Sequence, residues 1–562
     1  MQLSPSESRE PTNQSPTFTG NLYKADVAIQ QAVQRTGAAW ARERLDALGA
    51  QAGSEHVQEL AKAANDHKPE LRSHDRQGHR IDVVDFHPSW HELMQMSYES
   101  AVHSSAWLAE GREGAHTARA AMAYTWHQAE NGVCCPLAMS FAAVPALRKE
   151  PELAKFWEPK IIEPGYDARR IPGYEKAACT IGMAMTEKQG GSDLRATRTY
   201  AVPVGRSDLG NEYRITGHKW FCSAPMSDVF LTLAQTEHGV SCFLVPRLMP
   251  DGSRNPFHIQ RLKDKVGNRS NASSEIEYDN TRGYLVGPEG KGISVILEMG
   301  HLTRLDVTLG SAGIMRRALT EAINHTRHRR AFKRLLAAQP LMQSTLADMA
   351  IESEASTLLA MRAAQATDRA EKNEAERLLA RILVPAAKYL VCKRTPYFVT
   401  EALESIGGNG FVEETITARL YREAPLNGLW EGSGNVICLD VLRALRREPH
   451  TREALVNELK IGLKGDRLSA SLVRDMEALI DDALADERLG RELTERLAVA
   501  LQLSLLRQHS PGFMADAFAG SRLGARSQLT YGTTNFSGTS AVEILERSLP
   551  CEASEAGMKQ AA

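Results

Sequence analysis

The sequence predicts an α+β protein in which a β-domain is inserted between two helical regions. Apolar residues recur at three- and four-residue steps before about residue 180 and after about residue 288, which is typical of amphipathic helices. Between these regions the segments are short, rich in strand-forming residues and separated by turn clusters such as PDGSRNP. A chain of 562 residues is also too long for one ordinary core, so several domains are expected.

The N-terminal part divides into two segments. Residues 1–22 are rich in Ser, Pro, Thr and Gln and predict a disordered arm. Residues 23–180 predict an N-terminal helical domain, because stretches such as NLYKADVAIQQAVQR and TARAAMAYTWHQAENG carry the helical period. The second of these stretches ends on Asn-Gly, a helix stop signal.

The remaining chain divides into three segments. Residues 181–288, with DVFLTLAQTEHGVSCFLVP, predict an antiparallel β-domain. Residues 289–446 begin with about 40 residues that contain no proline and continue as two more long amphipathic helices, which predicts a bundle of the four-helix type. Residues 447–562 predict an extra C-terminal helical region with a less regular tail from about residue 520.

Composition excludes several classes of protein. The formal net charge is -2, so nothing global argues for a polyanion partner. The absence of a long apolar run and of a secretory leader predicts a cytoplasmic protein without a membrane span. The eight cysteines show no CxxC pair and no zinc spacing, which predicts reduced, mostly buried thiols and no metal site. Neither a Rossmann nor a P-loop fingerprint is present.

A loop with the sequence MTEKQGGSDL, residues 185–194, is the first candidate binding element. Its two glycines permit positive φ and a close approach of the backbone to a ligand, although an ordinary turn has the same composition. Three other stretches add to it: GHKWFCSAP at 217–225, EALESIGGNGFVEE at 401–414 and LWEGSGN at 429–435. The last places a carboxylate, Glu431, between an aromatic residue and two glycines.

In this order, these stretches resemble the acyl-CoA dehydrogenase flavoproteins. The details MTEKQGGSD, RLKDKVGNRSNAS, LWEGSGN and CLDVLRAL, together with the extended ends, resemble the AidB group of that family, which belongs to the bacterial adaptive response to DNA alkylation. The resemblance implies the acyl-CoA dehydrogenase fold and FAD as cofactor. It also implies an acyl-CoA ligand, duplex DNA as a partner and a homotetramer in which neighbouring subunits share the flavin.

The resemblance assigns the flavin site to the loop, one strand end, the stretch RHRRAFKRLLAAQP at 327–340 and two glycine turns. The residues it implies are Met185, Thr186, Glu187, Lys188, Gln189, Gly190, Gly191, Ser192, Asp193, Leu194, Phe221, Ser223, Ala224, Pro225, Arg329, Phe332, Gln339, Glu404, Gly407, Gly408, Leu429, Trp430, Gly432, Ser433, Gly434 and Asn435. Ser223 matches the hydroxyl residue that hydrogen-bonds flavin N5, and Phe221 matches an aromatic residue beside the ring. Lys333 and Glu404 depart from the usual glycine and glutamine of the family, and the AidB group also has the glutamate.

For catalysis, the resemblance places Glu431 as the base that removes the α-proton of an acyl thioester. Some members of the family carry the base on another helix, just before an arginine. Here that arginine is Arg304, and the residue before it is Thr303, which cannot serve as a base. We therefore expect Glu431 to be the base and Arg304 to favour its ionised form.

A DNA-binding surface is indicated only locally. Residues 443–562 contain 16 Lys and Arg against 17 Asp and Glu, so the region is not basic. Arg443, Arg446 and Arg447 share one helix face and are candidates for phosphate contacts; a solvated face paired with Glu448 and Glu453 is an equal alternative.

Three functions remain open from the sequence. The first is an AidB-type flavoprotein that binds DNA and protects or repairs it against alkylation. The second is an acyl-CoA dehydrogenase of a branched or short acyl-CoA, for which Trp430 in place of a tyrosine would narrow the acyl channel. The third is a flavin-stabilised scaffold without turnover.

Overall fold

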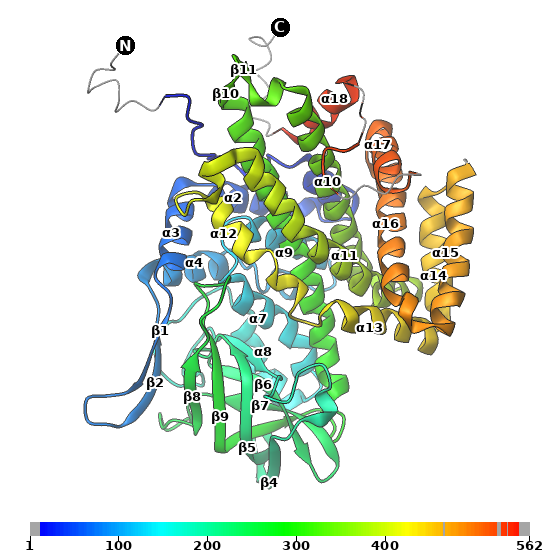
Figure 1. The fold of residues 1–562 in the computed structure, drawn as a ribbon. Coiled ribbons are helices and arrows are strands. Elements are labelled where there is room, and N and C mark those ends of the chain that lie inside the picture. Colours follow the sequence, from blue (N-terminus) through cyan, green and yellow to red (C-terminus); the bar gives the residue numbers. More distant parts are fainter. Residues whose placement is uncertain (1–11, 465–466, 525–529, 535, 537, 550–562) are drawn as a thin grey trace, which may run out of the picture.

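The computed structural model describes residues 12–464, 467–524, 530–534, 536 and 538–549. In Figure 1 the β-domain forms the lower end of the molecule, long helices run upward through its centre, and the C-terminal helices α14 to α17 stack along one side. The order of helical region, β-domain, bundle and extra helices agrees with the predicted fold class.

The N-terminal region is helical with one interruption. Its elements are α1 Val27–Arg35, α2 Arg42–Ala52, α3 Glu55–Asp66, β1 Glu70–His74, β2 Arg80–Asp85, α4 Pro88–Glu99, α5 Ser105–Leu108, α6 Ala115–His127, α7 Cys134–Leu147 and α8 Pro151–Ile162. The sequence did not predict the hairpin β1–β2, because Leu71 is the one apolar residue of β1 and a single apolar residue shows no period. Asp75 closes its turn by accepting hydrogen bonds from the backbone N–H groups of Gln77 (2.8 Å) and His79 (2.9 Å).

The β-domain is a seven-stranded sheet. Its strands are β3 Ile181–Ala184, β4 Tyr200–Ser207, β5 Gly210–Ser223, β6 Val229–Thr236, β7 Gly239–Pro246, β8 Phe257–Leu262 and β9 Ser273–Val286. The order is β3-β6-β4-β5-β9-β7, and β7 pairs again with β6, so the sheet closes on itself. Most pairs are antiparallel as predicted, but β3 and β4 run parallel to β6.

The bundle contains the long helices that the sequence predicts. It consists of α9 Gly292–His328, β10 Arg330–Ala331, β11 Arg334–Leu335, α10 Pro340–Arg369, α11 Glu374–Ile406, α12 Ile416–Glu423 and α13 Gly434–Arg447. Gly310 and Gly313 of α9 allow α6 to pack closely. A Cβ at Gly310 would lie 2.8 Å from the His127 ring, and one at Gly313 would lie 2.7 Å from the Tyr124 carbonyl oxygen.

The extra C-terminal region packs on the bundle rather than standing apart. Its helices are α14 His450–Gly462, α15 Arg467–Ala485, α16 Gly490–His509, α17 Gly512–Arg522 and α18 Gly538–Ser548. Helix α16 lies against α10, α11 and α13, and its buried leucines join the same core as those helices. The region is therefore positioned by the bundle and also borders the turn at residues 429–434, because Arg491 Nε donates to Asn435 Oδ1 at 2.7 Å.

The arm predicted over residues 1–22 lies only partly inside the described residues. Residues 12–22 do not extend freely into solvent, since Phe18 and Leu22 are buried in the main core. The Gln58 side-chain amide donates to the Phe18 carbonyl at 2.9 Å. Residues 1–11 lie outside the described residues.

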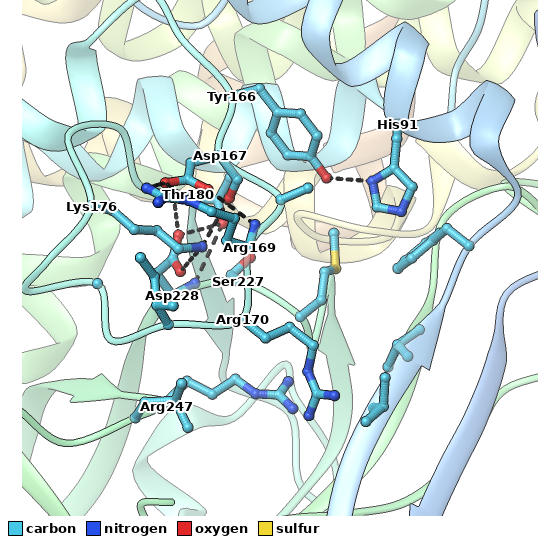
Figure 2. A pocket seen from close by; sticks show the side chains of 18 of the residues that line it. His91, Tyr166, Asp167, Arg169, Arg170, Lys176, Thr180, Ser227, Asp228 and Arg247 are labelled. Atoms are coloured by element: carbon cyan, nitrogen blue, oxygen red, sulfur yellow. Dashed lines mark hydrogen bonds and ion pairs between the residues drawn. The ribbon is translucent and has the colours of Figure 1, made fainter. Parts of the chain in front are cut away.

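A cavity of about 390 Å³ lies where the hairpin β1–β2 meets α4, the loop before β3 and the β-domain (Figure 2). None of the predicted flavin or base residues lines it.

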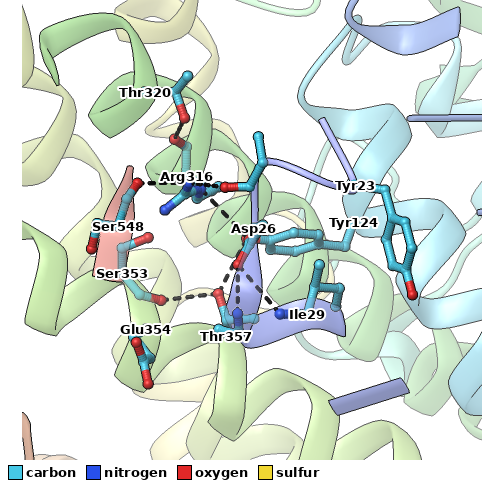
Figure 3. Close-up of polar contacts among 12 residues, drawn as sticks. Tyr23, Asp26, Ile29, Tyr124, Arg316, Thr320, Ser353, Glu354, Thr357 and Ser548 are labelled. Carbon is cyan, nitrogen blue, oxygen red and sulfur yellow. Dashed lines mark hydrogen bonds and ion pairs between the residues drawn. The ribbon is translucent and has the colours of Figure 1, made fainter. Parts of the chain in front are cut away.

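A buried polar junction joins the two ends of the chain to the bundle (Figure 3). Asp26 caps α1 through the Ala28 N–H (3.0 Å) and accepts from the Tyr124 hydroxyl at 2.6 Å. Arg316 of α9 lies 3.6 Å from the same carboxylate and donates to the Ser548 carbonyl at 3.0 Å. Helix α18 is thereby anchored to α9 beside the start of α1.

No helix among the described residues is long and apolar enough to cross a membrane. The seven described cysteines are free and buried, as predicted, and Cys551 lies outside the described residues.

Candidate active site

The turn at residues 429–434 holds Glu431 in an unusual backbone conformation. Glu431 has φ 58°, in the left-handed region that non-glycine residues avoid. Two cations fix the turn: Arg304 Nε donates to the Glu431 carbonyl at 3.1 Å, and Lys388 Nζ donates to the Gly432 carbonyl at 2.5 Å. A strained residue persists only where its surroundings determine it, so α9 and α11 together impose the position of Glu431.

Asp440 of α13 forms ion pairs with the arginines that surround the turn. Its carboxylate pairs with Arg304 at 2.7 Å and with Arg381 of α11 at 2.8 Å, and Arg443 approaches at 3.3 Å. Burial opposes ionisation of Asp440, but Arg304 and Arg381 hold its pKa below the ordinary value. The charged carboxylate therefore joins α9, α11 and α13 at the base of the turn.

The Glu431 carboxylate lies in a largely desolvated place. Burial raises its pKa above the ordinary value, while a hydrogen bond with Thr303 and the charges of Arg304 and Lys388 partly offset that rise. From the sequence, Thr303 was only excluded as the base. In the structure, its hydrogen bond with Glu431 favours the ionised form of that carboxylate.

The loop 185–194 is held from beneath by a buried ion pair. Lys219 Nζ of β5 lies 2.7 Å from Glu187 Oε1, and the two side chains are 0% and 1% exposed. Glu187 also accepts from the backbone N–H groups of Arg198 (2.7 Å) and Thr199 (3.2 Å). Burial would raise the pKa of Glu187, but Lys219 and these donors lower it to about 2. The Glu187 side chain thus faces the interior and anchors the loop.

Several other side chains of the loop bond within it. Gln189 Nε2 donates to Glu187 Oε2 at 2.6 Å and to the Ala196 carbonyl at 3.0 Å. Asp193 accepts from the Arg195 N–H at 3.3 Å. A Cβ on Gly191 would lie 2.3 Å from Thr186 Oγ1, so glycine is required there. The loop therefore has a fixed shape before any ligand arrives.

The loop, the end of β5 and the Glu431 turn form one group. Met185, Leu194 and Trp430 all pack against the same apolar core between α7 and the β-domain. Cys135 of α7 hydrogen-bonds with Ser223, and its pKa, raised by burial to about 12, is also raised by the charge of Glu431. The sequence did not single out Cys135, because only the tertiary fold brings α7 to this place.

The residues beside Glu431 and those after Ser223 differ in exposure and in backbone conformation. Trp430 is fixed through its indole N–H, which donates to Asn427 Oδ1 at 2.9 Å. Ala224 has φ 49° and Pro225 is buried, so the chain bends sharply after Ser223. Leu429 is 64% exposed, and Ser433 precedes the first turn of α13.

The other predicted flavin residues lie at the opposite end of the molecule. Arg329, Phe332 and Gln339 belong to the hairpin β10–β11 and its flanks, at the top of Figure 1, whereas β5 lies at the bottom. Arg304 and Arg329 are separated along α9 by 25 residues, or about 37 Å of helix. The predicted flavin-binding residues therefore do not all lie at one site within a single chain.

This second group is itself assembled from distant segments. The Asn13 side chain donates to the Arg330 carbonyl (2.9 Å), Arg329 donates to the Asn13 carbonyl (2.8 Å), and Asn409 beside Gly407 and Gly408 donates to Gln14 (3.1 Å). Glu404 lies in the last turn of α11, three residues before Gly407, and is exposed to solvent. No sequence motif indicates that residues 13 and 14 take part.

The residues present fit a flavin in two respects. Phe221, near the end of β5, is 50% exposed with Lys263 Nζ 4.8 Å from its ring centroid, and Phe332 is 91% exposed, so both aromatic side chains are accessible. A Cβ on Gly407 or Gly408 would meet no atom within 4 Å, which leaves open space over that backbone. Lys333, where the family has glycine, keeps a left-handed φ of 66°, so the hairpin turn is retained despite the substitution.

The three arginines of the predicted DNA face are exposed at the end of α13. Arg443 pairs with Asp440, and Arg446 donates to the Leu484 carbonyl at 3.1 Å. Glu448 does not neutralise them, since it pairs with Arg377 (3.0 Å) instead.

Substitution of Lys219 by Met tests the anchoring of the loop. It leaves the buried Glu187 without its cation, which is expected to cost about 3–5 kcal/mol of stability. Flavin content of the purified protein should fall with it. The double variant Lys219→Met, Glu187→Gln serves as the control and should recover most of the loss in thermal unfolding; equal destabilisation of both variants would contradict the anchoring role.

Comparisons with known proteins agree along most of the chain. Residues 13–168 match the family model of the adaptive response protein AidB N-terminal domain, residues 182–281 the acyl-CoA dehydrogenase middle domain, and residues 290–446 the acyl-CoA dehydrogenase C-terminal domain. The AidB protein of Escherichia coli (strain K12) is 46% identical over 484 residues, which cover 86% of this chain and 88% of that protein.

Two solved structures are similar over nearly their whole length. Caenorhabditis elegans ACDH-11 in complex with C11-CoA has a TM-score of 0.82 and 26% identity, and the match covers 98% of this chain and 94% of that one. The apo form of Bd2924 has a TM-score of 0.81 and 27% identity, and the match covers 89% of this chain and 100% of that one.

Proposed function

The chain belongs to the AidB branch of the acyl-CoA dehydrogenase family, whose members are FAD-dependent oxidoreductases, and we propose that its Glu431 removes the α-proton of an acyl-CoA thioester. The observation that carries the proposal is the Glu431 turn. A half-buried carboxylate, on a strained backbone held by Arg304 and Lys388 and with its pKa raised, is arranged for proton transfer rather than for stability.

The residues around the turn define the proton transfer. The C–H bond at the α-carbon breaks as an O–H bond forms on the Glu431 carboxylate. Bound FAD supplies the acceptor for the hydride that leaves the β-carbon. Trp430, Met185 and Leu194 pack against one apolar core beside the turn. Thr303 supports the ionised form of the base before the reaction.

For the cofactor, we assign the isoalloxazine side to the loop 185–194, Phe221 and Ser223. The loop is preformed by the ion pair between Glu187 and Lys219, Ser223 offers a hydroxyl, and Phe221 offers an aromatic face. The group around Arg329 and Gly407 then serves the flavin of another subunit, since it lies too far from Ser223 to reach the same flavin. A homo-oligomer, a tetramer in the usual state of the family, follows from this division.

Replacement of Glu431 by Gln tests the proposed activity. The amide keeps the shape of the side chain but cannot accept the proton, so flavin reduction by an acyl-CoA should slow by about 10²–10⁴-fold. Stopped-flow absorbance with a panel of short, branched and medium-chain acyl-CoAs measures it. Flavin content should be unchanged, and reduction at the wild-type rate would exclude Glu431 as the base.

The pH dependence of the same reaction tests the role of Thr303. Glu431 works only when ionised, and its pKa lies above the ordinary value, so the rate should fall as the pH falls through that pKa. Thr303→Val removes a hydrogen bond that favours the carboxylate, which raises the pKa further and moves the acid limb to higher pH. Thr303→Ser keeps the donor and should restore the wild-type profile; a Val profile that does not move would contradict the contact.

The shared flavin is tested by a surface substitution outside the proposed flavin residues. Leu341, at the start of α10, is 84% exposed and lies two residues after Gln339. Leu341→Glu should dissociate the oligomer in light scattering and reduce bound FAD. Leu108→Glu, at a 49% exposed leucine of the N-terminal region, is the matched control and should change neither. A monomer that retains full FAD would refute the shared site.

A second function, binding of duplex DNA in defence against alkylation, is favoured by one observation. Arg443, Arg446 and Arg447 are exposed together on α13, and their nearest glutamate pairs elsewhere. The match of residues 13–168 to the adaptive response protein AidB supports the same role.

The buried free thiols suit a reducing compartment, so we place the protein in the cytoplasm.

The DNA proposal predicts salt-dependent binding without sequence preference. Replacement of the three arginines by Ala should weaken binding and lower the log–log salt slope by about 0.9 for each lost phosphate contact. Arg488 and Arg496 lie in the same region but pair with Asp486 and Glu492, so their Ala variants serve as the control and should bind normally. Absence of duplex binding by the wild type at low salt would leave the dehydrogenase proposal alone.

A further inference from the structure

The cavity of about 390 Å³ beside the hairpin β1–β2 has the size of a small-molecule site (Figure 2). It is bounded by the hairpin, α4, the loop at residues 166–173 and the ends of β6 and β7. The AidB-type N-terminal region therefore supplies one wall and the β-domain the other. This site is separate from the Glu431 turn and goes beyond the proposed activity.

Positive charge is in excess on the wall of this cavity. Arg254 and Arg80 share one carboxylate, the fully buried Asp82. Within the described part of the chain, Arg247 donates hydrogen bonds only to main-chain oxygens, those of Pro225 and Asp82 (the latter at 2.5 Å). Among the described residues, Arg170 makes a single hydrogen bond, a long one of 3.5 Å to the Ile81 carbonyl.

The other carboxylates at the cavity already have cations. Asp85 pairs with Arg72, Asp167 with Arg169 (2.6 Å) and Asp228 with Lys176 (2.8 Å). Burial lowers the pKa of Arg247 to about 10, and the charges of Arg254 and Arg170 lower it too, so the group is still charged at neutral pH. The arginines repel one another across the cavity, and a bound anion would relieve that repulsion.

A second, independent observation points to a ligand. Ser227 lines the cavity, its side chain is fully buried, and its hydroxyl has no hydrogen-bond partner among the described residues. Buried polar groups are nearly always paired, so an orphaned hydroxyl at a cavity wall marks a place for an external acceptor or donor. The neighbouring polar pair His91 and Tyr166 is already satisfied at 2.8 Å, and burial lowers the pKa of His91, which keeps it neutral.

The rest of the wall is apolar. Val83, Phe86, Met94, Met226 and Phe257 contribute side chains to the lining. A simple inorganic anion would leave this surface unfilled, whereas an aliphatic chain would cover it.

We propose that this cavity binds an amphipathic anion, with a carboxylate or phosphate head group at Arg170, Arg247 and Ser227 and an aliphatic tail against the apolar wall. Both head groups accept hydrogen bonds from guanidinium and hydroxyl donors, and both neutralise the excess charge. The two sources are separated by experiment rather than by the site itself.

The test is calorimetric titration of the full-length, FAD-loaded protein with octanoate, octyl phosphate, inorganic phosphate and octanol. At least one of the two octyl anions should bind, and the stronger identifies the head group. Inorganic phosphate lacks the tail and octanol lacks the charge, so each should bind at least about tenfold more weakly. Equal binding of octanol, or no binding of either octyl anion, would overturn the proposal.

Two variants separate recognition from folding. Arg170→Gln removes a guanidinium that repels Arg247, and Ser227→Ala removes an unpaired buried hydroxyl. Neither should lower the thermal stability of the free protein, yet each should weaken binding of the octyl anion by about tenfold. The double variant Arg169→Gln, Asp167→Asn removes a neighbouring guanidinium together with the carboxylate that it pairs with, so it leaves the net charge of the wall unchanged; it is the matched control and should bind normally. Wild-type affinity in both Arg170→Gln and Ser227→Ala would overturn the assignment, and so would an equal loss in the control.

Discussion

The charged carboxylate of Asp440 is the constraint on which the arrangement of the active site depends. It holds Arg304 and Arg381 at once, and Arg304 in turn holds the backbone of Glu431. Removal of one partner from such a buried pair leaves an uncompensated charge, so the three helices that meet there are committed to one geometry. A left-handed glutamate becomes tolerable in that setting, and its carboxylate is presented to the core between α7 and the β-domain.

A second buried ion pair, between Glu187 and Lys219, holds the loop on the other side of the candidate site. Glu187 and Lys219 fix the loop at 185–194 before any ligand is present, at the cost of burying two charges. Trp430 of the turn and Met185 of the loop pack against the same apolar core, whereas the group around Arg329 lies about 37 Å along α9 from Arg304. The rigid length of that helix is the reason for our proposal that a second chain completes the flavin site, and for the expectation that oligomerisation and cofactor binding fail together.

Much of this could be predicted from local signals. The proline-free run of α9, the helix break at Gly407 and the strands of the β-domain follow from period and turn residues. The hairpin β1–β2 could not, because β1 has one apolar residue and β2 places Val83 and Val84 side by side, so neither strand shows a clear period of two. The resemblance supplied Glu431 and the loop, but not what holds them. The contacts of Asp440, Cys135 and Asn13 join residues far apart in the chain, and no local pattern encodes such pairs.

The most direct test of the account is the exchange of the α-proton of an acyl-CoA for deuterium in D₂O, followed by NMR. Exchange requires a positioned base but no electron acceptor, so it isolates what Asp440 and Glu431 do. We predict ready exchange by the wild type, none above background with Glu431→Gln, and a loss of about tenfold or more with Asp440→Asn at unchanged FAD content. Wild-type exchange by Asp440→Asn would show that the ion pair with Arg304 does not position the base.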